Sequence, residues 1–281
     1  MYPIREATHL NTEMTRLVVE APAIARKARP GQFVILRIDE EGERIPLTIN
    51  DADPGQGTVT VIFQAVGATT MQLSTLEAGS ALEDFAGPLG NPTDFGGAQR
   101  VCVVGGGLGT AIAYPDAKWL HENGRHVDVI VGFRNKYIIM LEDELRALSD
   151  DLVVMTDDGS NGNKGFVTVA LRDKIEAGAG YDLVVAIGPA IMMKNVCKVT
   201  KPYGVRTLVS LNPIMIDGTG MCGGCRVNVG GVYKHACVDG PDFDGHQVDW
   251  DEVMRRSTMY RYYETQARSF YQGMSGVEEP R

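Results

Sequence analysis

Several features that would define other classes of protein are missing from this sequence. Its 281 residues contain no run of about 18 apolar residues, so a membrane-spanning helix is not expected. The first five residues, Met-Tyr-Pro-Ile-Arg, lack the apolar core of a signal peptide. Basic residues number 27 against 36 acidic ones, and the net charge of −9 disfavours nucleic acid as a partner. We therefore expect a cytoplasmic chain that is long enough for two or three domains.

Cysteine is scarce, with five residues in the whole chain. Three of the five fall within one short stretch, which favours ligation in a reducing compartment over disulfide bonds. The other two, Cys102 and Cys197, lie within apolar segments. We expect both to pack as small buried side chains.

The clustered cysteines follow the spacing D-x4-C-x2-C-x11-C, formed by Asp217, Cys222, Cys225 and Cys237. Plant-type [2Fe–2S] proteins use C-x4-C-x2-C and a distant fourth cysteine, so the spacing is kept and Asp217 stands at the first ligand position. Four anionic donors must converge on two irons, and the intervening glycines allow the tight loop that this requires. The motif therefore predicts a [2Fe–2S] cluster held by these four residues.

The residues alone leave alternatives open for this motif. The three motif cysteines and His235 would also make a Cys3His zinc set, although His235 lies very close to Cys237 in the sequence. Asp217 could also be a surface aspartate in a glycine-rich turn, with a water, His235 or Asp239 completing the site.

Residues 1–97 contain short alternating runs that are separated by Pro-Gly turns. Three of the runs have the composition and length of strands, at Thr15–Glu20, Gln32–Ile38 and Thr58–Phe63. No long helical pattern precedes residue 70. This pattern predicts a small antiparallel β-barrel.

Two segments of this first domain are suited to bind a diphosphate. The segment Arg44–Thr48 combines an arginine, a proline and a hydroxyl, and Gly67–Thr70 opens a predicted helix at Thr69–Leu76. An arginine and the amides of a helix N-terminus together bind diphosphates well. Taken singly, the segments could also be a solvated arginine beside an edge-strand proline and an ordinary threonine cap.

Residues 98–211 alternate between apolar strands and helical stretches. Helices are expected at Lys136–Leu148 and Val167–Ala177, and a further helix is expected to begin near Pro115, because proline is favoured in a first helical turn. Such alternation predicts a parallel sheet with crossover helices. The expected strands are Arg100–Val104, Val127–Val131, Leu152–Met155, Leu183–Ile187 and Arg206–Ser210.

The first of these strands runs into a glycine-rich loop, Gly105–Thr110. A dinucleotide phosphate rests on such a loop in many α/β proteins, although glycines also simply turn the chain. The loops after the later strands, at 132–135, 156–160 and 188–192, would face the same crevice. Arg134 is the one arginine near the end of the second strand, which favours NAD over NADP.

Together these motifs resemble the ferredoxin–NADP reductase superfamily. The segments Pro30–Val34, Arg44–Thr48, Gly67–Thr70, Gly87–Gly90 and Gly188–Met193 occur in the order typical of its members. The resemblance implies a barrel that binds FAD and a second domain that binds NAD(H). The residues implied for FAD are Arg44, Pro46, Leu47, Thr48, Ile62, Phe63, Gln64, Gly67, Thr69 and Thr70. The residues expected to contact NAD are Gly106, Gly107, Leu108, Gly109, Thr110, Arg134, Asp157, Asp158, Gly188 and Pro189.

The order of barrel, nucleotide domain and a cluster segment at 212–281 resembles a narrower family of iron–sulfur electron-transfer subunits. That family includes the subunit of dihydroorotate dehydrogenase B and the beta subunit of sulfide dehydrogenase. It also includes the small subunit of NADH-dependent reduced ferredoxin:NADP+ oxidoreductase, an electron-bifurcating enzyme. The dihydroorotate subunit has cysteine at the first ligand position, whereas Asp217 resembles the other two.

This resemblance implies an oxidoreductase subunit that passes electrons between NAD(H), FAD and a [2Fe–2S] cluster, with no side chain acting as an acid or base. A relay without its own substrate pocket implies a larger catalytic partner in a heterodimer. By resemblance, that partner carries another FAD and [4Fe–4S] clusters, and it meets NADP and ferredoxin. A stand-alone NADH reductase and a non-catalytic module with a structural zinc are the alternatives.

The C-terminal stretch Trp250–Tyr271 is rich in aromatic residues. Tyr260, Tyr263, Ala267 and Tyr271 fall near helical spacing, which predicts a helix that packs on its own domain or on a partner. Residues 273–281 are expected to fray.

Overall fold

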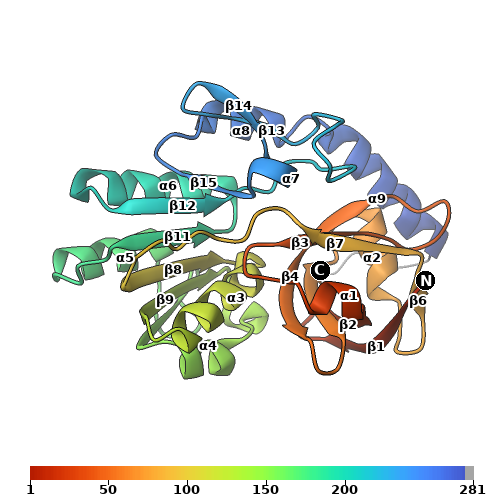
Figure 1. The fold of residues 1–281 in the computed structure, drawn as a ribbon, viewed down its shortest axis with the longest axis horizontal. Helices are drawn as coiled ribbons and strands as arrows, with labels where there is room; N and C mark the ends of the chain where they lie inside the picture. The colour runs from red at the N-terminus through yellow and green to blue at the C-terminus, as the bar shows by residue number, and fades with distance from the viewer. Residues whose placement is uncertain (276–281) are drawn as a thin grey trace.

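The N-terminal part of the chain forms the antiparallel barrel that its alternating strands predict (Figure 1). The computed structural model describes residues 1–275. Seven strands lie in the order β6-β1-β2-β5-β4-β3-β7, and the apolar side chains that alternate along them form one core. The elements of this part are β1 (Tyr2–His9), β2 (Met14–Glu20), α1 (Pro22–Ala25), β3 (Phe33–Arg37), β4 (Ile45–Asp53), β5 (Thr58–Gln64), α2 (Ala68–Ser74), β6 (Ala81–Leu82) and β7 (Asp84–Leu89).

The middle part forms the predicted parallel sheet with crossover helices. Its strands lie in the order β10-β9-β8-β11-β12-β15, and all neighbours are parallel except β12 and β15. The central strands are apolar on both faces because packed helices and loops cover both. The elements are β8 (Arg100–Gly106), α3 (Gly109–Glu122), β9 (His126–Phe133), η1 (Lys136–Ile138), α4 (Glu142–Leu148), β10 (Asp151–Thr156), α5 (Val167–Glu176), β11 (Leu183–Ile187), α6 (Ala190–Thr200), η2 (Lys201–Tyr203) and β12 (Arg206–Ser210).

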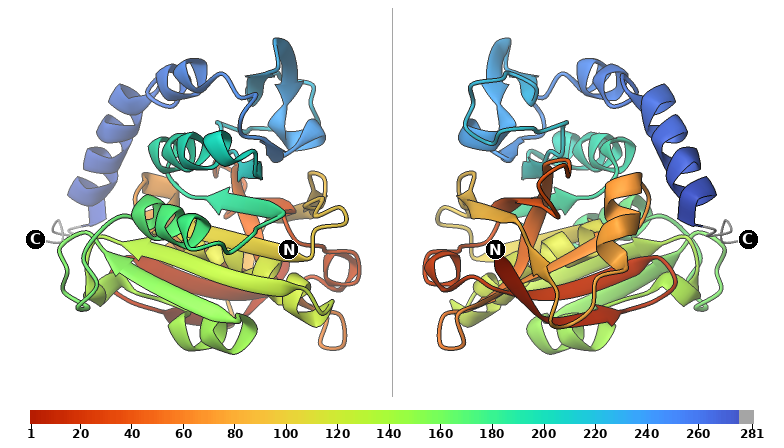
Figure 2. Two further views of the ribbon diagram at one scale, coloured as in Figure 1. Left: turned by 90° about the vertical axis from the view of Figure 1, so that its left-hand side faces the viewer. Right: turned by 90° about the vertical axis from the view of Figure 1, so that its right-hand side faces the viewer.

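The C-terminal part of the chain packs against both of the other parts. Strand β15 pairs antiparallel with β12, and Figure 2 shows α8 and α9 arching from the β13–β14 hairpin toward the barrel, where α9 packs against α2. No helix within residues 1–275 is long and apolar enough to cross a membrane. The elements are β13 (Arg226–Val229), β14 (Val232–His235), α7 (Ala236–Asp239), β15 (Asp242–Asp244), α8 (Trp250–Arg256) and α9 (Arg261–Ser275).

The predicted tail helix is confirmed as α9, and it packs on the barrel of its own chain. The expectation that residues 273–281 fray is wrong for 273–275, because α9 continues through Ser275. Residues 276–281 lie outside the described part of the chain.

Helix α3 corrects the expected helix start near Pro115. It begins at Gly109, directly after the glycine loop, and Pro115 lies inside it. A proline has no N–H, so the carbonyl of Ala111, four residues earlier, loses its helical partner. The side-chain Nδ2 of Asn50, from barrel strand β4, donates to that carbonyl oxygen across 2.7 Å. The defect in the helix is therefore a point at which the barrel docks.

The expected helix Lys136–Leu148 is split into two pieces. A 3-10 turn covers Lys136–Ile138, and α4 begins only at Glu142. Between them Leu141 has a φ of 57°, a left-handed conformation that a continuous helix does not allow. Ile138 and Met140 are both buried, so the break lets this segment contribute to the core.

The two isolated cysteines are buried, as predicted. Cys102 lies in the centre of β8 and Cys197 on the inner face of α6. Burial raises the pKa of both thiols, to about 12 for Cys197. Neither thiol is therefore a reactive thiolate at neutral pH.

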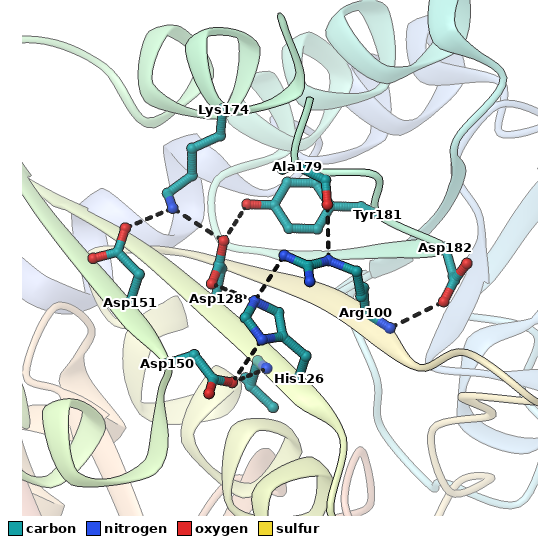
Figure 3. Close-up of polar contacts among 10 residues, drawn as sticks. Arg100, His126, Asp128, Asp150, Asp151, Lys174, Ala179, Tyr181 and Asp182 are labelled. Carbon is teal, nitrogen blue, oxygen red and sulfur yellow. Dashed lines mark hydrogen bonds and ion pairs between the residues drawn. The ribbon is translucent and has the colours of Figure 1, made fainter. Parts of the chain in front are cut away.

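A polar network lies at the amino-terminal ends of the parallel strands (Figure 3). Its centre is Asp128, which accepts hydrogen bonds from the Tyr181 hydroxyl at 2.5 Å and from Lys174 Nζ at 3.0 Å. Burial by itself would raise the pKa of Asp128, but these two hydrogen bonds outweigh burial and lower it. The network lies at the opposite end of the strands from the glycine loop, so we assign it a structural role.

A pair of carboxyl groups lies where the three parts of the chain meet. Asp116 of α3 is buried, as is the Oδ1 atom of Asp242 in β15, and the Thr93 hydroxyl donates to Asp242 Oδ2 at 2.6 Å. Burial raises the pKa of both carboxyls, and the nearby charge of Asp242 raises that of Asp116 further. A proton retained by this pair avoids two adjacent buried negative charges.

The docking of Asn50 on α3 can be tested by a double-mutant cycle. Asn50→Leu leaves the Ala111 carbonyl buried without a partner, which should lower the free energy of unfolding by about 1–3 kcal/mol. In a Pro115→Ala background residue 115 regains its N–H, so the same change should cost less. Urea unfolding of the four proteins measures both costs. Equal costs in both backgrounds would show that the proline and the asparagine do not share this carbonyl.

Candidate cofactor sites

The barrel has an opening between the strands β4 and β5. Strand β4 pairs with β5 only from Ile49 onward, and β5 pairs with β4 only up to Val61. Residues 45–48 therefore pair with β3 alone, and residues 62–64 pair with β2 alone. The unpaired edge is also the reason that β4 tolerates Pro46. Six of the residues predicted to contact FAD border this opening, namely 46–48 and 62–64.

Helix α2 begins beside this opening, because β5 leads directly into it. The Thr70 hydroxyl accepts hydrogen bonds from the amides of Val66 and Gly67 at 3.1 and 2.9 Å, which fixes the first turn. The Thr69 hydroxyl donates to Glu43 Oε2 at 2.7 Å, and the neighbouring Arg44 is exposed. This arrangement fits a diphosphate between an arginine and a helix N-terminus.

The side chains of Ile62 and Phe63 do not line the opening. Both are buried, Ile62 against the nucleotide domain and Phe63 inside the barrel. Only their backbone groups on the unpaired edge of β5 could meet a flavin. Leu47 and Thr48 are half-buried beside them.

The glycine loop after β8 is used largely for close packing. A Cβ at Gly109 would lie 2.2 Å from the carbonyl oxygen of Ile187, and one at Gly106 would lie 2.4 Å from the sulfur of Met192. Larger residues would therefore separate this loop from the loop after β11. Gly106, Gly109 and Thr110 are buried by this contact, whereas Gly107, Leu108, Gly188 and Pro189 remain at the surface.

Arg134 is engaged by an acidic residue that sequence analysis did not single out. Its Nη2 lies 2.6 Å from both carboxylate oxygens of Glu13, in the β1–β2 turn of the barrel. The same carboxylate accepts a hydrogen bond from Gln64 Nε2 at 2.5 Å. Glu13 thus links a residue predicted for FAD to one predicted for NAD. No motif surrounds Glu13, so only the folded chain reveals this role.

The two predicted acidic contacts, Asp157 and Asp158, are exposed after β10. The amide of Ser160 donates to Asp158 Oδ1 at 2.9 Å, and bonds with Ser160 lower the pKa of this carboxyl. The Ser160 hydroxyl in turn accepts a hydrogen bond from the amide of Lys136 at 2.8 Å. Asp158 therefore orders the loop at this end of the sheet.

The cysteine loop brings two of its three thiols into contact. The sulfur atoms of Cys225 and Cys237 are 3.2 Å apart and buried, whereas Cys222 is exposed. Burial raises the pKa of Cys237 to about 12, and its hydrogen bond with Cys225 adds to this effect. The thiol of Cys237 therefore keeps its proton in the absence of iron, and ligation would release it.

Asp217 lies beside Cys222. Its Oδ2 accepts a hydrogen bond from the amide of Cys222 at 3.0 Å, and its Oδ1 accepts one from the amide of Thr219 at 2.8 Å. The bond from Thr219 is the largest cause that lowers the pKa of this carboxyl. The four predicted ligands thus form two pairs, which suits a cluster of two irons.

The residues proposed for a zinc site do not gather in this way. Within residues 1–275, no three His, Cys, Asp or Glu side chains lie close enough together to hold one metal ion. Asp239, the alternative to Asp217 as the group that completes the site, accepts a hydrogen bond at Oδ2 from the amide of His235 at 2.7 Å. The geometry therefore favours a two-iron cluster over a Cys3His zinc site.

The cysteine loop packs directly against the barrel. A Cβ on Gly218, next to Asp217, would lie 2.7 Å from Ile35 and 2.8 Å from Leu89. Ile35 is the ladder partner of Pro46, in the strand predicted to line the flavin. Ile35, Leu89, Cys225 and Cys237 share one hydrophobic cluster. The predicted cluster loop is therefore one strand away from the predicted flavin strand.

Comparison with known proteins agrees with this arrangement. Residues 212–249 match the model of the iron–sulfur cluster binding domain of dihydroorotate dehydrogenase B. A homologue of the dihydroorotate dehydrogenase B (NAD+) electron-transfer subunit from Thermotoga maritima is 48% identical over 246 residues, which cover 88% of this chain and 86% of the relative. The electron-transfer subunit from Clostridium perfringens is 32% identical over 250 residues, covering 88% of this chain and 96% of the relative.

A solved structure is similar over nearly the whole chain. It is a chain of the NADH-dependent reduced ferredoxin-NADP oxidoreductase, determined in a study of flavin-based electron bifurcation. The sequence identity is 43% and the TM-score is 0.91, and the match covers 96% of this chain and 98% of that chain.

Barrel, parallel sheet and cysteine loop together define an electron-transfer flavoprotein of the iron–sulfur, NAD(H)-dependent class. The chain belongs to the family of dihydroorotate dehydrogenase B electron-transfer subunits and their homologues. The family resemblance that its motifs carry is thereby confirmed.

The opening between β4 and β5 can be tested through Arg44. Arg44→Ala removes the exposed side chain next to Glu43, which contacts helix α2, and a charge-assisted hydrogen bond contributes about 1.5–3 kcal/mol. The affinity for FAD should therefore fall roughly 10- to 100-fold. Flavin absorbance after dialysis and calorimetric titration with FAD measure the loss. Arg26→Ala, an exposed arginine on the same domain, serves as the control. Unchanged affinity in Arg44→Ala would place the diphosphate elsewhere.

Proposed function

We propose that this chain is the small subunit of an electron-bifurcating NADH-dependent ferredoxin:NADP+ oxidoreductase. In this role it passes electrons between NAD(H), FAD and a [2Fe–2S] cluster. The observation that carries the proposal is the contact of Gly218 with Ile35, which joins the cluster loop to the neighbour of the flavin strand. The match over nearly the full length of the ferredoxin-NADP oxidoreductase chain supports the same assignment.

The bound cofactors together supply the conversion of a two-electron hydride transfer into single-electron transfers. The chain binds and orients them. Arg44 and the first turn of α2 hold the diphosphate of FAD, and residues 46–48 orient the ring at the opening of the barrel. The backbone groups of 62–64, on the unpaired edge of β5, would contact the ring as well.

The nucleotide domain presents NAD(H) to this opening. Gly107, Leu108, Gly188 and Pro189 form the accessible part of the crevice at the carboxyl end of the sheet. Arg134 is the arginine at its rim, and Glu13 compensates its charge. A site with one compensated arginine is poorly suited to a 2′-phosphate, so the preference is for NADH.

The cluster loop Asp217–Cys225 and Cys237 of α7 together provide four ligands, and two of the four are shielded from water. Cys225 and Cys237 are buried, whereas Cys222 faces outward. Asp217 is the fourth ligand, in the position that a cysteine occupies in plant-type sites. By resemblance, a carboxylate at this position favours the bifurcating enzyme and sulfide dehydrogenase over dihydroorotate dehydrogenase.

The surface around Cys222 is suited to a protein partner. Met221 is 88% exposed and Ile216 is 54% exposed, and Val238 beside Gly220 is exposed as well. An apolar rim of this kind around an exposed ligand is typical of an interaction site. The partner is a larger catalytic subunit with FAD and [4Fe–4S] clusters, through which the heterodimer meets NADP and ferredoxin in the cytoplasm.

A second candidate function is the electron-transfer subunit of dihydroorotate dehydrogenase itself. The family model over residues 212–249 and the Clostridium perfringens relative favour it. The identity of the subunit that co-purifies with the chain distinguishes the two functions. A dihydroorotate-oxidising partner supports the second, and a partner that reduces NADP+ with NADH and reduced ferredoxin supports the first.

The nucleotide preference is tested on the anaerobic, flavin-loaded subunit. NADH should bleach the flavin faster than NADPH at the same concentration, because the single arginine at the rim is already paired. Stopped-flow absorbance measures both rates. Equal rates with the two nucleotides would contradict the NADH preference, and no bleaching by either would contradict the proposed function.

The fourth cluster ligand is tested by replacing Asp217. Asp217→Cys should keep the cluster, lower its reduction potential and shift its EPR g values, because a thiolate donates more electron density to iron than a carboxylate. Asp217→Ala should leave one iron open to solvent and make the cluster labile. EPR-monitored redox titration and iron content measure these changes.

The matched control for this test is Asp239→Asn, which alters the other carboxylate near the motif. It should leave the g values and the iron content unchanged. A stable cluster with an unchanged spectrum in Asp217→Ala would remove Asp217 from the ligand set. An altered spectrum in Asp239→Asn would point to Asp239 instead.

A further inference from the structure

The last turn of helix α8 reaches the cluster loop. Arg256 Nη2 donates a hydrogen bond to the carbonyl oxygen of Gly224 at 2.9 Å, and Gly224 lies between the ligand positions Cys222 and Cys225. Arg256 is half-buried in this contact, whereas the preceding residue, Arg255, is exposed. A residue of the C-terminal tail, outside the matched iron–sulfur domain at 212–249, therefore touches the centre of the loop.

Helix α8 is firmly held, so this contact is not a chance surface pairing. Asp249 caps the helix by accepting a hydrogen bond from the amide of Glu252 at 3.0 Å. The amide of Asp249 donates to the carbonyl of Asn228 in β13, and Trp250 Nε1 donates to the carbonyl of Gly245 at 3.0 Å. These bonds fix the helix to the hairpin and to the segment after β15, and so they fix the direction of Arg256.

The hydrogen bond to Gly224 also orients the peptide that follows it. In a trans peptide the C=O and N–H groups point in opposite directions, so holding the Gly224 carbonyl toward Arg256 turns the Cys225 amide away from it. None of the hydrogen bonds within residues 1–275 uses the Cys225 amide as a donor. That amide is thus available to a sulfur ligand, and amide bonds to sulfur favour the reduced state of a cluster.

The charge of Arg256 acts in the same direction. A guanidinium stays protonated at all ordinary pH values. Within the described part of the chain, no carboxylate lies within ion-pair distance of Arg256. One-electron reduction adds one negative charge to the loop and breaks no bond, so a fixed positive charge beside it stabilises the reduced form.

We propose that Arg256 is a positioning residue that sets the reduction potential of the iron–sulfur cluster. It does so by holding the Gly224–Cys225 peptide and by placing one unpaired positive charge beside the loop. This inference rests on the proposed function, because it requires a [2Fe–2S] cluster in the loop Asp217–Cys225.

The experiment compares Arg256→Gln with Arg255→Gln in the full chain. Both remove one positive charge from adjacent positions of α8, but only Arg256 contacts the loop. EPR-monitored redox titration of the anaerobic protein should give a more negative midpoint potential for Arg256→Gln. Arg255→Gln should match the wild type. Arg256→Lys keeps the charge but lacks the planar fork, so its potential should fall between those of the wild type and Arg256→Gln.

Each outcome decides a separate point. An unchanged potential in Arg256→Gln, or an equal shift in Arg255→Gln, would overturn the inference. Loss of iron from both Arg256 variants, with iron retained in Arg255→Gln, would make Arg256 a structural residue and would also overturn it. A wild-type protein that shows no [2Fe–2S] EPR signal after anaerobic reduction would overturn the proposed function and the inference with it.

Discussion

Pro115 leaves the carbonyl of Ala111 without a helical partner. The need to satisfy this carbonyl constrains how the barrel docks on the nucleotide domain. Asn50 satisfies this buried group from strand β4. Asn50 follows the segment 46–48 that borders the barrel opening, and Ala111 follows the glycine loop. This buried hydrogen bond connects the strand predicted for FAD to the helix that follows the loop predicted for NAD. An unsatisfied carbonyl at this point would make any other docking of the two domains costly.

The C-terminal segment contacts both the nucleotide domain and the barrel. Strand β15 extends the parallel sheet beside β12, and Gly218 packs on the barrel at Ile35. The buried carboxyl pair of Asp116 and Asp242 lies at the same junction. The cluster loop is therefore held by rigid elements of both other parts, as electron transfer at a defined distance requires. Cys222, the exposed member of the predicted ligand set, remains accessible at the surface.

Much of the fold could be predicted from local patterns. Period-two runs predicted the barrel strands, and continuous apolar runs predicted the parallel sheet, because each pattern reflects which faces are buried. The helix start at Pro115 was wrong, since the compensating Asn50 lies 65 positions earlier in the chain and has no local signature. The break at Leu141 was missed for a related reason: burial of Ile138 and Met140 outweighs helical propensity there.

The identity and spacing of residues therefore established the family, the kinds of cofactor and the four candidate cluster ligands. They could do so because the residues of each motif lie close together in the sequence. The spacing of Asp217, Cys222, Cys225 and Cys237 needed no coordinates to suggest two irons. The neighbours of these motifs were decided by folding. Glu13 beside Arg134 and Arg256 beside Gly224 are contacts between residues far apart in sequence. Such pairs arise from the packing of whole elements, and neither residue of a pair carries a local pattern that identifies its partner.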